Sequence, residues 1–504
     1  MKTQSPLFLL SVCAASVVAI ANDGHAELSL SRVFDNGCVL QAEKPLRVFG
    51  LATPESEIIV KIEGTDSRTT ESRAITDDTG RWLAVLPPLK ASHDPLQMVI
   101  TGDGGVIERE ELIAGDVWLF TGQSNMVWAL EKTLDGADTA KDFNAPHVRF
   151  FKVKTAIQSK PQTSLAGGTW YLTDDKSELG TTSAVAAYFA QAHAAQSDSP
   201  IGVIVSALGA TPLEAWAERS VLEESRVMDQ TLELWDTAIR GEEPGQTLFT
   251  KYKLDSKGRR RPSGLYNGMI APLRSLSVRG ISWYQGEGNC ERAKQYRTLL
   301  PMLIRSWREH FHDATLPFAV VQLAGWKAGK AKGKAVPWLR DAQAETTHRI
   351  PNTTLIVTYD TSETDGNIHP KYKKPVGQRL ASWARGIVFD DREIPGPPTL
   401  VSHTINSQSI TLRFRTTGDL IASSESLDSW EVAGEDLNFV PANARIVSKN
   451  QIVVTSKSVN SPRFVRFAWT AWPQGASIHD ESDLPLAPFR TDNAPDPTRA
   501  DGLP

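Results

Sequence analysis

The chain has 504 residues, which is enough for two or three domains that each bury a sizeable hydrophobic core. Apolar residues make up 40% of the chain and charged residues 22%, which is typical of an ordinary globular protein and excludes a largely disordered one. The formal net charge of −5 does not favour binding to nucleic acid or to an anionic membrane surface, so neither partner is expected.

Residues 1–26 have the pattern of an export signal. Lys2 precedes an apolar stretch at residues 7–21 that ends in small residues. This stretch is short for a membrane span, and no later segment offers about 18 consecutive apolar residues. We therefore expect an exported protein, periplasmic or extracellular, without a membrane span. Its two later cysteines, Cys38 and Cys290, are expected to be separate buried thiols.

Residues 27–113 are predicted to form a β-sandwich module, because short apolar runs alternate with turn-forming Asp and Gly clusters. The predicted strands include residues 46–49, 58–62, 82–85 and 97–100.

The pattern changes over residues 114–390, where strands alternate with longer helical segments. Such alternation predicts a largely parallel sheet with helices on both faces, a three-layer α/β/α domain. The predicted strands are residues 117–120, 202–206, 280–285, 318–323 and 354–358; the predicted helices are residues 184–196, 292–311, 338–348 and 373–389. A Pro/Gly hinge leads to a C-terminal β-rich region at residues 399–490, and residues 491–504 are predicted to be a loose tail.

Four polar motifs follow predicted strands of the central domain. The first is Gly122-Gln123-Ser124-Asn125, which follows the strand at residues 117–120 after Thr121. This motif fits an ordinary turn with a helix cap, or a turn that presents a hydroxyl to a substrate. Ligands of parallel sheets bind beyond the carboxyl ends of the strands, and Ser124 lies at that end.

The second and third motifs offer groups that could stabilise negative charge. In ALGATPLEAW, the lack of a side chain at Gly209 allows a backbone N–H to approach a ligand closely. In WYQGEGN, the amide of Asn289 can donate a hydrogen bond to a developing oxyanion. Each motif taken alone also fits a simple turn.

The fourth motif, DGNIHP, contains a candidate general base. His369 precedes a proline, which favours an extended backbone and projects the side chain from a loop. An Asp a few residues earlier could hold one imidazole nitrogen, leaving the other free to take a proton from a serine.

The motifs GQSNM, ALGATPLEAW, WYQGEGN and DGNIHPKYKKPVGQRLASWA, in this order, closely resemble the sialate O-acetylesterase-like group of the SGNH (GDSL-type) hydrolases. The resemblance extends to VFDNGCVLQAEKPLRVFG and DDTGRWLAVLPPLK in the N-terminal module, to GLYNGMIAPL, and to LPLAPFRTD near the C-terminus. It implies an SGNH-hydrolase central domain that removes acetyl esters from carbohydrates.

The resemblance also implies a role for each matching residue. Ser124 is the nucleophile, and His369 is the general base and then the acid. The oxyanion hole consists of the Ser124 N–H, the Gly209 N–H and the Asn289 side chain. Gln123 and Asn125 shape the turn. No cofactor or metal is expected, since no metal-ligand spacing such as HExxH occurs in the sequence.

The sequence departs from the group's pattern at two important places. Ala210 stands where a second glycine is usual; a positive φ is costly for Ala, so we expect Gly209 to supply the flexible position.

The other departure concerns the acid of the triad. The superfamily has Asp three residues before the histidine and the narrower group often has it two before, but this chain has Gly366 and Asn367 there. We assign Asp365 as the acid. Asp360, Glu287 and a serine–histidine dyad are the alternatives.

The substrate is predicted to be an acetylated plant polysaccharide, such as xylan or xyloglucan, or an O-acetylated sialic acid. A sialic acid carboxylate requires Arg or Lys, and the basic residues 327–334, which precede Trp338-Leu339-Arg340, are candidates unless they form a solvated loop. The alternative functions are a non-catalytic glycan-binding protein and a lipase-like esterase of broader acyl specificity.

Overall fold

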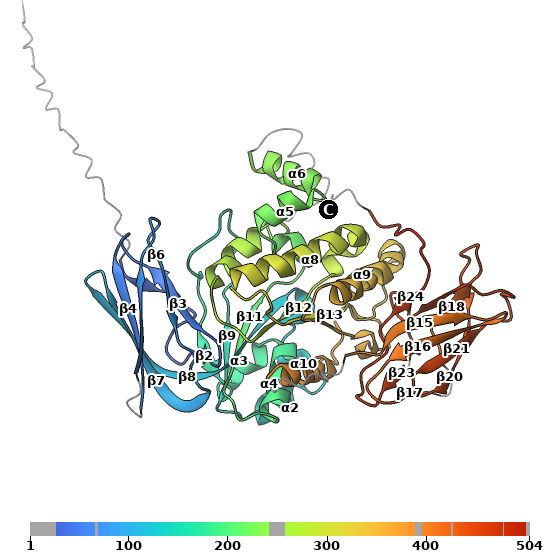
Figure 1. Cartoon of the computed structure of the whole chain (residues 1–504), viewed down its shortest axis with the longest axis horizontal. Helices are drawn as coiled ribbons and strands as arrows, with labels where there is room; N and C mark the ends of the chain where they lie inside the picture. Colours follow the sequence, from blue (N-terminus) through green and yellow to red (C-terminus); the bar gives the residue numbers. More distant parts are fainter. Residues whose placement is uncertain are drawn as a thin grey trace, which may run out of the picture.

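The computed structural model describes residues 27–65, 69–240, 258–388, 396–424, 427–476 and 478–499. The expected export signal at residues 1–26 lies outside these ranges. Three regions follow one another along the long axis of the molecule: an all-β region, an α/β centre and a second β-rich region (Figure 1). The α/β class and the flanking β-rich regions agree with the prediction from sequence.

The N-terminal region consists of two mainly antiparallel sheets that enclose one core. In β4 (Glu57–Gly64), Ile58, Val60 and Ile62 are buried, as expected for a strand with one face on a core. Across this core lie Val48 and Trp82 of the other sheet. The remaining strands are β1 (Ser29–Leu30), β2 (Val39–Gln41), β3 (Leu46–Leu51), β5 (Thr69–Ile75), β6 (Arg81–Leu86) and β7 (Ser92–Gly102).

A single long strand, β8 (Gly105–Gly122), joins this region to the central domain. Its first part pairs with β7 in antiparallel fashion, and its second part pairs in parallel with β11 and β12 of the central sheet. The expected domain boundary at residue 113 therefore falls inside a continuous strand. The strand ends at Gly122, two residues before Ser124.

The central sheet has the strand order β10-β9-β11-β8-β12-β13-β14. All neighbours in it are parallel except β10 and β9. The strand bounds are β9 (Val148–Lys152), β10 (Trp170–Leu172), β11 (Ile201–Ala207), β12 (Gly280–Tyr284), β13 (Phe318–Val321) and β14 (Thr353–Ile356). Strands β9 and β10 were not predicted; the other strands were.

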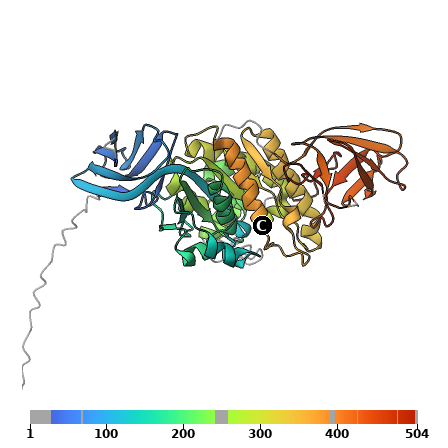
Figure 2. The same cartoon turned by 90° about the horizontal axis from the view of Figure 1, so that it is seen from below.

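Helices cover both faces of this sheet, as predicted (Figures 1 and 2). Leu119 of β8 packs in the core that contains α8 (Ala293–His310) and α9 (Lys330–Arg349). Its neighbour Phe120 points to the opposite core, which contains α4 (Ala184–Ala194) and α10 (Lys374–Val388). Short helices in the connections are α1 (Ser124–Val127), α2 (Gly136–Asp142), α3 (Lys176–Thr181), α5 (Arg219–Ser225) and α6 (Asp229–Arg240).

Helix α9 begins at Lys330, well before the predicted start at residue 338. Gly333 and Pro337 lie inside it, and both residues usually favour loops. Most of the basic segment at residues 327–334 therefore forms the first turns of a helix. Packing of the buried second half of α9 against the sheet accounts for this, because tertiary contacts outweigh weak local preferences.

The C-terminal region is built from antiparallel sheets around a separate core that includes Trp430 and Phe467. The strands are β15 (Thr399–Ile405), β16 (Ser409–Arg415), β17 (Leu420–Ala422), β18 (Trp430–Ala433), β19 (Val440–Pro441), β20 (Asn443–Ser448), β21 (Gln451–Thr455), β22 (Phe464–Phe467), β23 (Ile478–Asp480) and β24 (Phe489–Arg490).

Residues 491–499 are anchored, so the expectation of a loose tail is wrong for this part of the chain. Asp492 forms an ion pair with Arg466, the hydroxyl of Thr498 accepts from the N–H of Lys294, and the N–H of Arg499 donates to the carbonyl of Glu291. These anchors are polar, so the low apolar content of the segment gave no indication of them.

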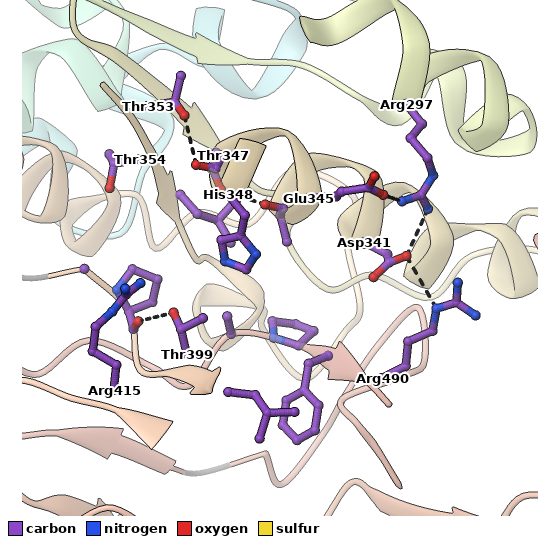
Figure 3. Close-up of a pocket in the computed structure, with 18 of the residues that line it drawn as sticks. Arg297, Asp341, Glu345, Thr347, His348, Thr353, Thr354, Thr399, Arg415 and Arg490 are labelled. Atoms are coloured by element: carbon purple, nitrogen blue, oxygen red, sulfur yellow. Dashed lines mark hydrogen bonds and ion pairs between the residues drawn. The ribbon is translucent and has the colours of Figure 1, made fainter. Parts of the chain in front are cut away.

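A cleft of about 420 Å³ separates α9 from the C-terminal strands (Figure 3). Arg297 forms ion pairs with Asp341 and Glu345, and Arg490 approaches Asp341 from the opposite wall. These charges pair with one another across the boundary and thereby connect the two regions.

Among the described residues, no helix has the length and apolar character that a membrane span requires.

Candidate active site

The predicted nucleophile lies on a turn that only glycine allows. Gly122 has a φ of +137°, and a Cβ at this position would lie 2.2 Å from the carbonyl oxygen of Tyr284. This close approach lets the N–H of Gln123 donate to the same carbonyl at 2.9 Å. Ser124 then opens the short helix α1 and is partly exposed at the carboxyl edge of the sheet. The hydroxyl of Ser124 lies 3.5 Å from the side-chain nitrogen, Nε2, of Gln123.

The second motif brings Gly209 against the nucleophile. A Cβ at Gly209 would lie 3.4 Å from the Cβ of Ser124 and 3.9 Å from the backbone nitrogen of Ser124. Within the described part of the chain, the backbone N–H groups of Ser124 and Gly209 donate to no protein acceptor. Two donors near the serine are therefore available to an oxygen of a ligand.

The expectation that Gly209 supplies the flexible backbone position is wrong. Ala210 has the positive φ, +61°, whereas Gly209 stays outside the left-handed region. A left-handed residue other than glycine costs about 1–2 kcal/mol, which an isolated, exposed alanine tolerates. The importance of Gly209 is thus the space that it leaves beside Ser124.

Gln285 ties three of the motifs together beneath this site. It follows β12 and is completely buried, and its side-chain nitrogen lies within hydrogen-bond distance of three oxygens. These are the side-chain oxygen of Gln123 at 3.2 Å, the carbonyl of Thr211 at 3.1 Å and the side-chain oxygen of Asn289 at 2.7 Å. Gln285 was given no role from the sequence, although its place at the end of the predicted strand at residues 280–285 was a usable signal.

Asn289 is held by groups of the second motif. Its Nδ2 donates to Oε2 of Glu214 at 2.9 Å, and its Oδ1 also accepts from the N–H of Leu213 at 2.9 Å. Glu214 in turn forms a buried ion pair with Arg292 at 2.8 Å. One of the two amide hydrogens of Asn289 is therefore used by Glu214.

The histidine loop lies against the serine helix. The His369 ring stacks on Trp128, and Asn125, which follows Ser124, donates to the carbonyl of Ile368 at 3.1 Å. The N–H of His369 donates to the side chain of Asn367 at 2.9 Å. Partial burial, and to a lesser degree the charge of Lys373, lower the pKa of the imidazole, so it is neutral at neutral pH. Ser124 and His369 are thus on segments in direct contact, although the described residues show no hydrogen bond between the two side chains.

Each candidate acid has another partner. Oδ1 of the exposed Asp365 accepts from the N–H of Asn367 at 2.9 Å. Asp360 forms an ion pair with Arg379, and Glu287 accepts from Asn125. In the described part of the chain, no carboxylate lies within ion-pairing distance of the His369 ring.

The backbone explains why the usual position of the acid is vacant. Gly366, three residues before His369, has a φ of +67°. A Cβ there would lie 2.7 Å from the Cβ of Lys327 and 3.2 Å from the ring of Trp472. An aspartate at residue 366 would therefore require this loop to move.

The basic residues next to the site have different roles. Arg340 is fully buried and donates to the carbonyls of Leu323, Ala324, Thr470 and Ala471. It holds the C-terminal region against the central domain and has no surface to offer a substrate. Lys327 is exposed, with its amine 5.3 Å from the centre of the Trp472 ring.

Comparison with known families adds to this geometry. The model of the family "Carbohydrate esterase, sialic acid-specific acetylesterase" matches residues 114–385, more than half of the chain. The chain belongs to this family. This family is one of SGNH-type hydrolases that act on acetylated carbohydrates. The chain is therefore a carboxylic ester hydrolase.

The similarity to individual relatives extends over almost the whole chain. A sialate O-acetylesterase from Mus musculus is 25% identical over 96% of this chain and 98% of its own length. The sialate O-acetylesterase from Homo sapiens is 26% identical over 90% of this chain and 91% of its own length. The crystal structure of a carbohydrate acetylesterase from Xanthomonas citri is 31% identical, covers 92% of this chain and 100% of its own, and superimposes with a TM-score of 0.80.

Proposed function

We propose that this protein removes acetyl esters from glycans by a serine acyl-enzyme mechanism, with Ser124 as the nucleophile. The observation that carries the proposal is the pair of unengaged N–H groups, from Ser124 and Gly209, next to a partly exposed hydroxyl. Such donors stabilise the oxyanion of a tetrahedral intermediate, and losing one commonly costs about 3 kcal/mol in the barrier.

In the proposed reaction, Oγ of Ser124 attacks the acetyl carbonyl carbon while His369 takes the hydroxyl proton. The N–H groups of Ser124 and Gly209, with the remaining amide hydrogen of Asn289, receive the oxyanion. The C–O bond to the sugar then breaks, and His369 gives its proton to the departing sugar oxygen. Water repeats the sequence on the acetyl-serine and releases acetate. A neutral imidazole is the form that this first step requires, and the lowered pKa of His369 supports it.

Asp365 remains the acid that we propose to test first. It lies on the same loop as His369, and its exposed side chain is able to rotate. The alternatives are Asp360, Glu287 and a dyad without an acid. Comparing kcat for Asp365→Ala, Asp360→Ala and Glu287→Ala identifies the acid, and near wild-type kcat in all three supports the dyad.

The proposed substrate is an acetylated plant polysaccharide, such as xylan or xyloglucan, with O-acetylated sialic acid as the other candidate. The named activities of the relatives support a carbohydrate ester. Release of acetate from acetylated xylan, xyloglucan and an acetylated sialoside, measured side by side, decides between them. Octanoate esters in the same panel test the lipase-like alternative.

The proposed export is tested by N-terminal sequencing of the processed protein.

The decisive experiment for the mechanism is the Ser124→Ala variant. We expect kcat for p-nitrophenyl acetate to fall at least about a thousandfold while the melting temperature stays close to that of the wild type. Saturable binding of an acetylated oligosaccharide without acetate release by the wild type would support a glycan-binding protein instead. A folded Ser124→Ala variant with wild-type activity would exclude the assigned nucleophile.

A further inference from the structure

Three buried polar side chains, linked by hydrogen bonds, lie next to the nucleophile. The amine of Lys373, which is fully buried, donates to Oδ1 of Asn125 at 2.5 Å. Nδ2 of Asn125 donates to Oε1 of Glu287, also at 2.5 Å. Asn125 thus connects a buried amine to a buried carboxylate; the reaction described above uses neither Asn125 nor Lys373, and names Glu287 only as an alternative acid.

The carboxylate of Glu287 also receives hydrogen bonds from the backbone N–H groups of Glu287 and Gly286, whereas Asn125 is the one hydrogen-bond partner of the Lys373 amine among the described residues. Oε2 of Glu287 is buried without a partner, and the amine of Lys373 otherwise faces the ring of Tyr284 at 5.6 Å. Uncompensated buried charges are costly, so the amine of Lys373 depends on Asn125 and on its attraction to the Glu287 carboxylate. Burial lowers the pKa of Lys373 to about 7 and raises the pKa of Glu287.

Asn125, the central residue of these three, contacts both the serine turn and the histidine loop. Asn125 directly follows Ser124, and its Nδ2 also donates to the carbonyl of Ile368, the residue before His369. Because the Asn125 side chain is hydrogen-bonded to a buried charged group on each side, it has little rotational freedom. It therefore fixes the distance between the serine turn and the histidine loop.

We propose that Asn125 is a positioning residue, clamped by Lys373 and Glu287, and that the Lys373 cation extends the action of the His369 base to lower pH. This inference rests on the proposed function, since it assigns His369 the role of a base. It goes beyond the reading of Asn125 as a residue that only shapes the turn.

The electrostatic part follows from the groups that surround the lysine and the histidine. Lys373 faces Glu287 and Glu363, whose charges favour its protonated form, and burial opposes them. The positive charge near His369 disfavours a second positive charge, and thereby lowers the pKa of the imidazole further than burial alone. Because the neutral imidazole is the active form, removing the lysine charge should move the acidic limb of the activity profile to higher pH.

The test compares the wild type with Lys373→Met, Glu287→Gln and the control Lys371→Met. Lys371 has the same charge two residues earlier in the chain, but its side chain is exposed. Glu287→Gln keeps the volume of the side chain and an acceptor for Asn125. For each protein, kcat and KM for p-nitrophenyl acetate are measured across the acidic and neutral range, with the melting temperature. The protonation midpoint of His369 is read separately by NMR of the imidazole protons.

We expect Lys373→Met to lower kcat at neutral pH about tenfold or more with little change in KM, because a small misplacement of reacting groups is costly. The His369 midpoint should rise in Lys373→Met and, less strongly, in Glu287→Gln, whose lysine has lost its carboxylate partner. Lys371→Met should match the wild type, because water and salt screen its charge.

Variants that lose only melting temperature, with wild-type kcat and an unchanged His369 midpoint at a temperature where all are folded, would overturn the proposal. The NMR midpoint does not depend on turnover, so it tests the inference even in a protein that hydrolyses no ester. Absence of acetate release by the wild type would instead contradict the proposed function.

Discussion

The indole of Trp128 stacks on the imidazole of His369, with ring centroids 4.7 Å apart and an angle of 21° between the planes. Trp128 comes four residues after Ser124, so the segment that carries the serine also supports the proposed base. In the described part of the chain the His369 ring has no hydrogen-bond partner, which leaves this contact to orient it.

The Trp128→Ala variant should therefore lose activity more than stability. We expect kcat for p-nitrophenyl acetate to fall about tenfold, because the imidazole gains rotational freedom. The melting temperature should change little, since Trp128 is only partly buried. Trp128→Phe keeps a stacking surface and should recover most of the rate. Equal losses in the Phe and Ala variants would argue against orientation by stacking.

Gly209 provides a test of the space beside the nucleophile. The Cβ added in Gly209→Ala meets Ser124 at an ordinary contact distance and requires no unusual φ, so stability should stay within about 0.5 kcal/mol of the wild type. The methyl group nevertheless occupies space beside the two free N–H groups, and kcat/KM should fall about tenfold. Ala210→Gly serves as the control, because it relieves the positive φ of Ala210 and should leave kcat unchanged. Steady-state kinetics and thermal melts check both.

His193 should make the protein less stable in acid. The ring is fully buried between Trp118 and Phe189, and neither ring nitrogen has a hydrogen-bond partner among the residues that the structure describes. Burial lowers its pKa from 6.5 to about 4. Between these pH values the unfolded chain binds a proton that the folded protein does not, so stability falls as the pH falls through this window, by about 3 kcal/mol in total.

His193→Leu removes the titrating ring and its unpaired nitrogens. Denaturant unfolding should show a gain in stability over the wild type that is larger at pH 5 than at pH 8. His403, which is exposed in the C-terminal region, is the matched site for a control His403→Leu variant. A gain for His193→Leu that does not depend on pH would contradict the assignment.

The two described cysteines should not react in the folded protein. Cys38 and Cys290 are both buried and unpaired, as the sequence analysis expected. Burial raises the pKa of the Cys38 thiol to about 12 and also raises that of Cys290, and the thiol form is a poor nucleophile. Iodoacetamide followed by peptide mapping should label both residues only after unfolding. Labelling of either one in the native state would indicate local opening.

Trp472 should affect large substrates only. Its ring packs on Gly366 of the histidine loop and remains partly exposed, so it gives a sugar chain a surface on which to stack near the site. Trp472→Ala is expected to raise KM for an acetylated oligosaccharide about fivefold while KM for p-nitrophenyl acetate stays constant. Equal effects on both substrates would point to a displaced loop.

The elements of the central domain were predictable because their signals are strong. Strands such as β11 and β12 are short, mainly apolar runs, and helices such as α8 carry a regular apolar face. Strand β9, which contains two charged residues in five, and the first half of α9, which contains Gly333, carry no comparable signal. Their conformations are set by neighbours that are distant in the sequence.

The same limit applies to the site. The motifs placed Ser124, Gly209 and His369 on segments that meet, since each motif follows a strand of one sheet. The partners of Asp365, Asn289 and Asn125 depend on side-chain rotamers and on approach between loops, which spacing along the chain does not encode. The positive φ of Ala210 shows that residue type alone also misassigned the strained position.

Strand β8 has a consequence for anyone who wishes to shorten or recombine this protein. An uninterrupted length of backbone belongs to the sandwich at one end and delivers the nucleophile at the other, and β2 is hydrogen-bonded to it between the two sheets. A fragment that begins at residue 114 would lose half of this strand and leave backbone hydrogen-bonding groups at the cut without their partners. The two regions should therefore melt in one cooperative transition, and a graft from another esterase has to carry both sheets as a unit.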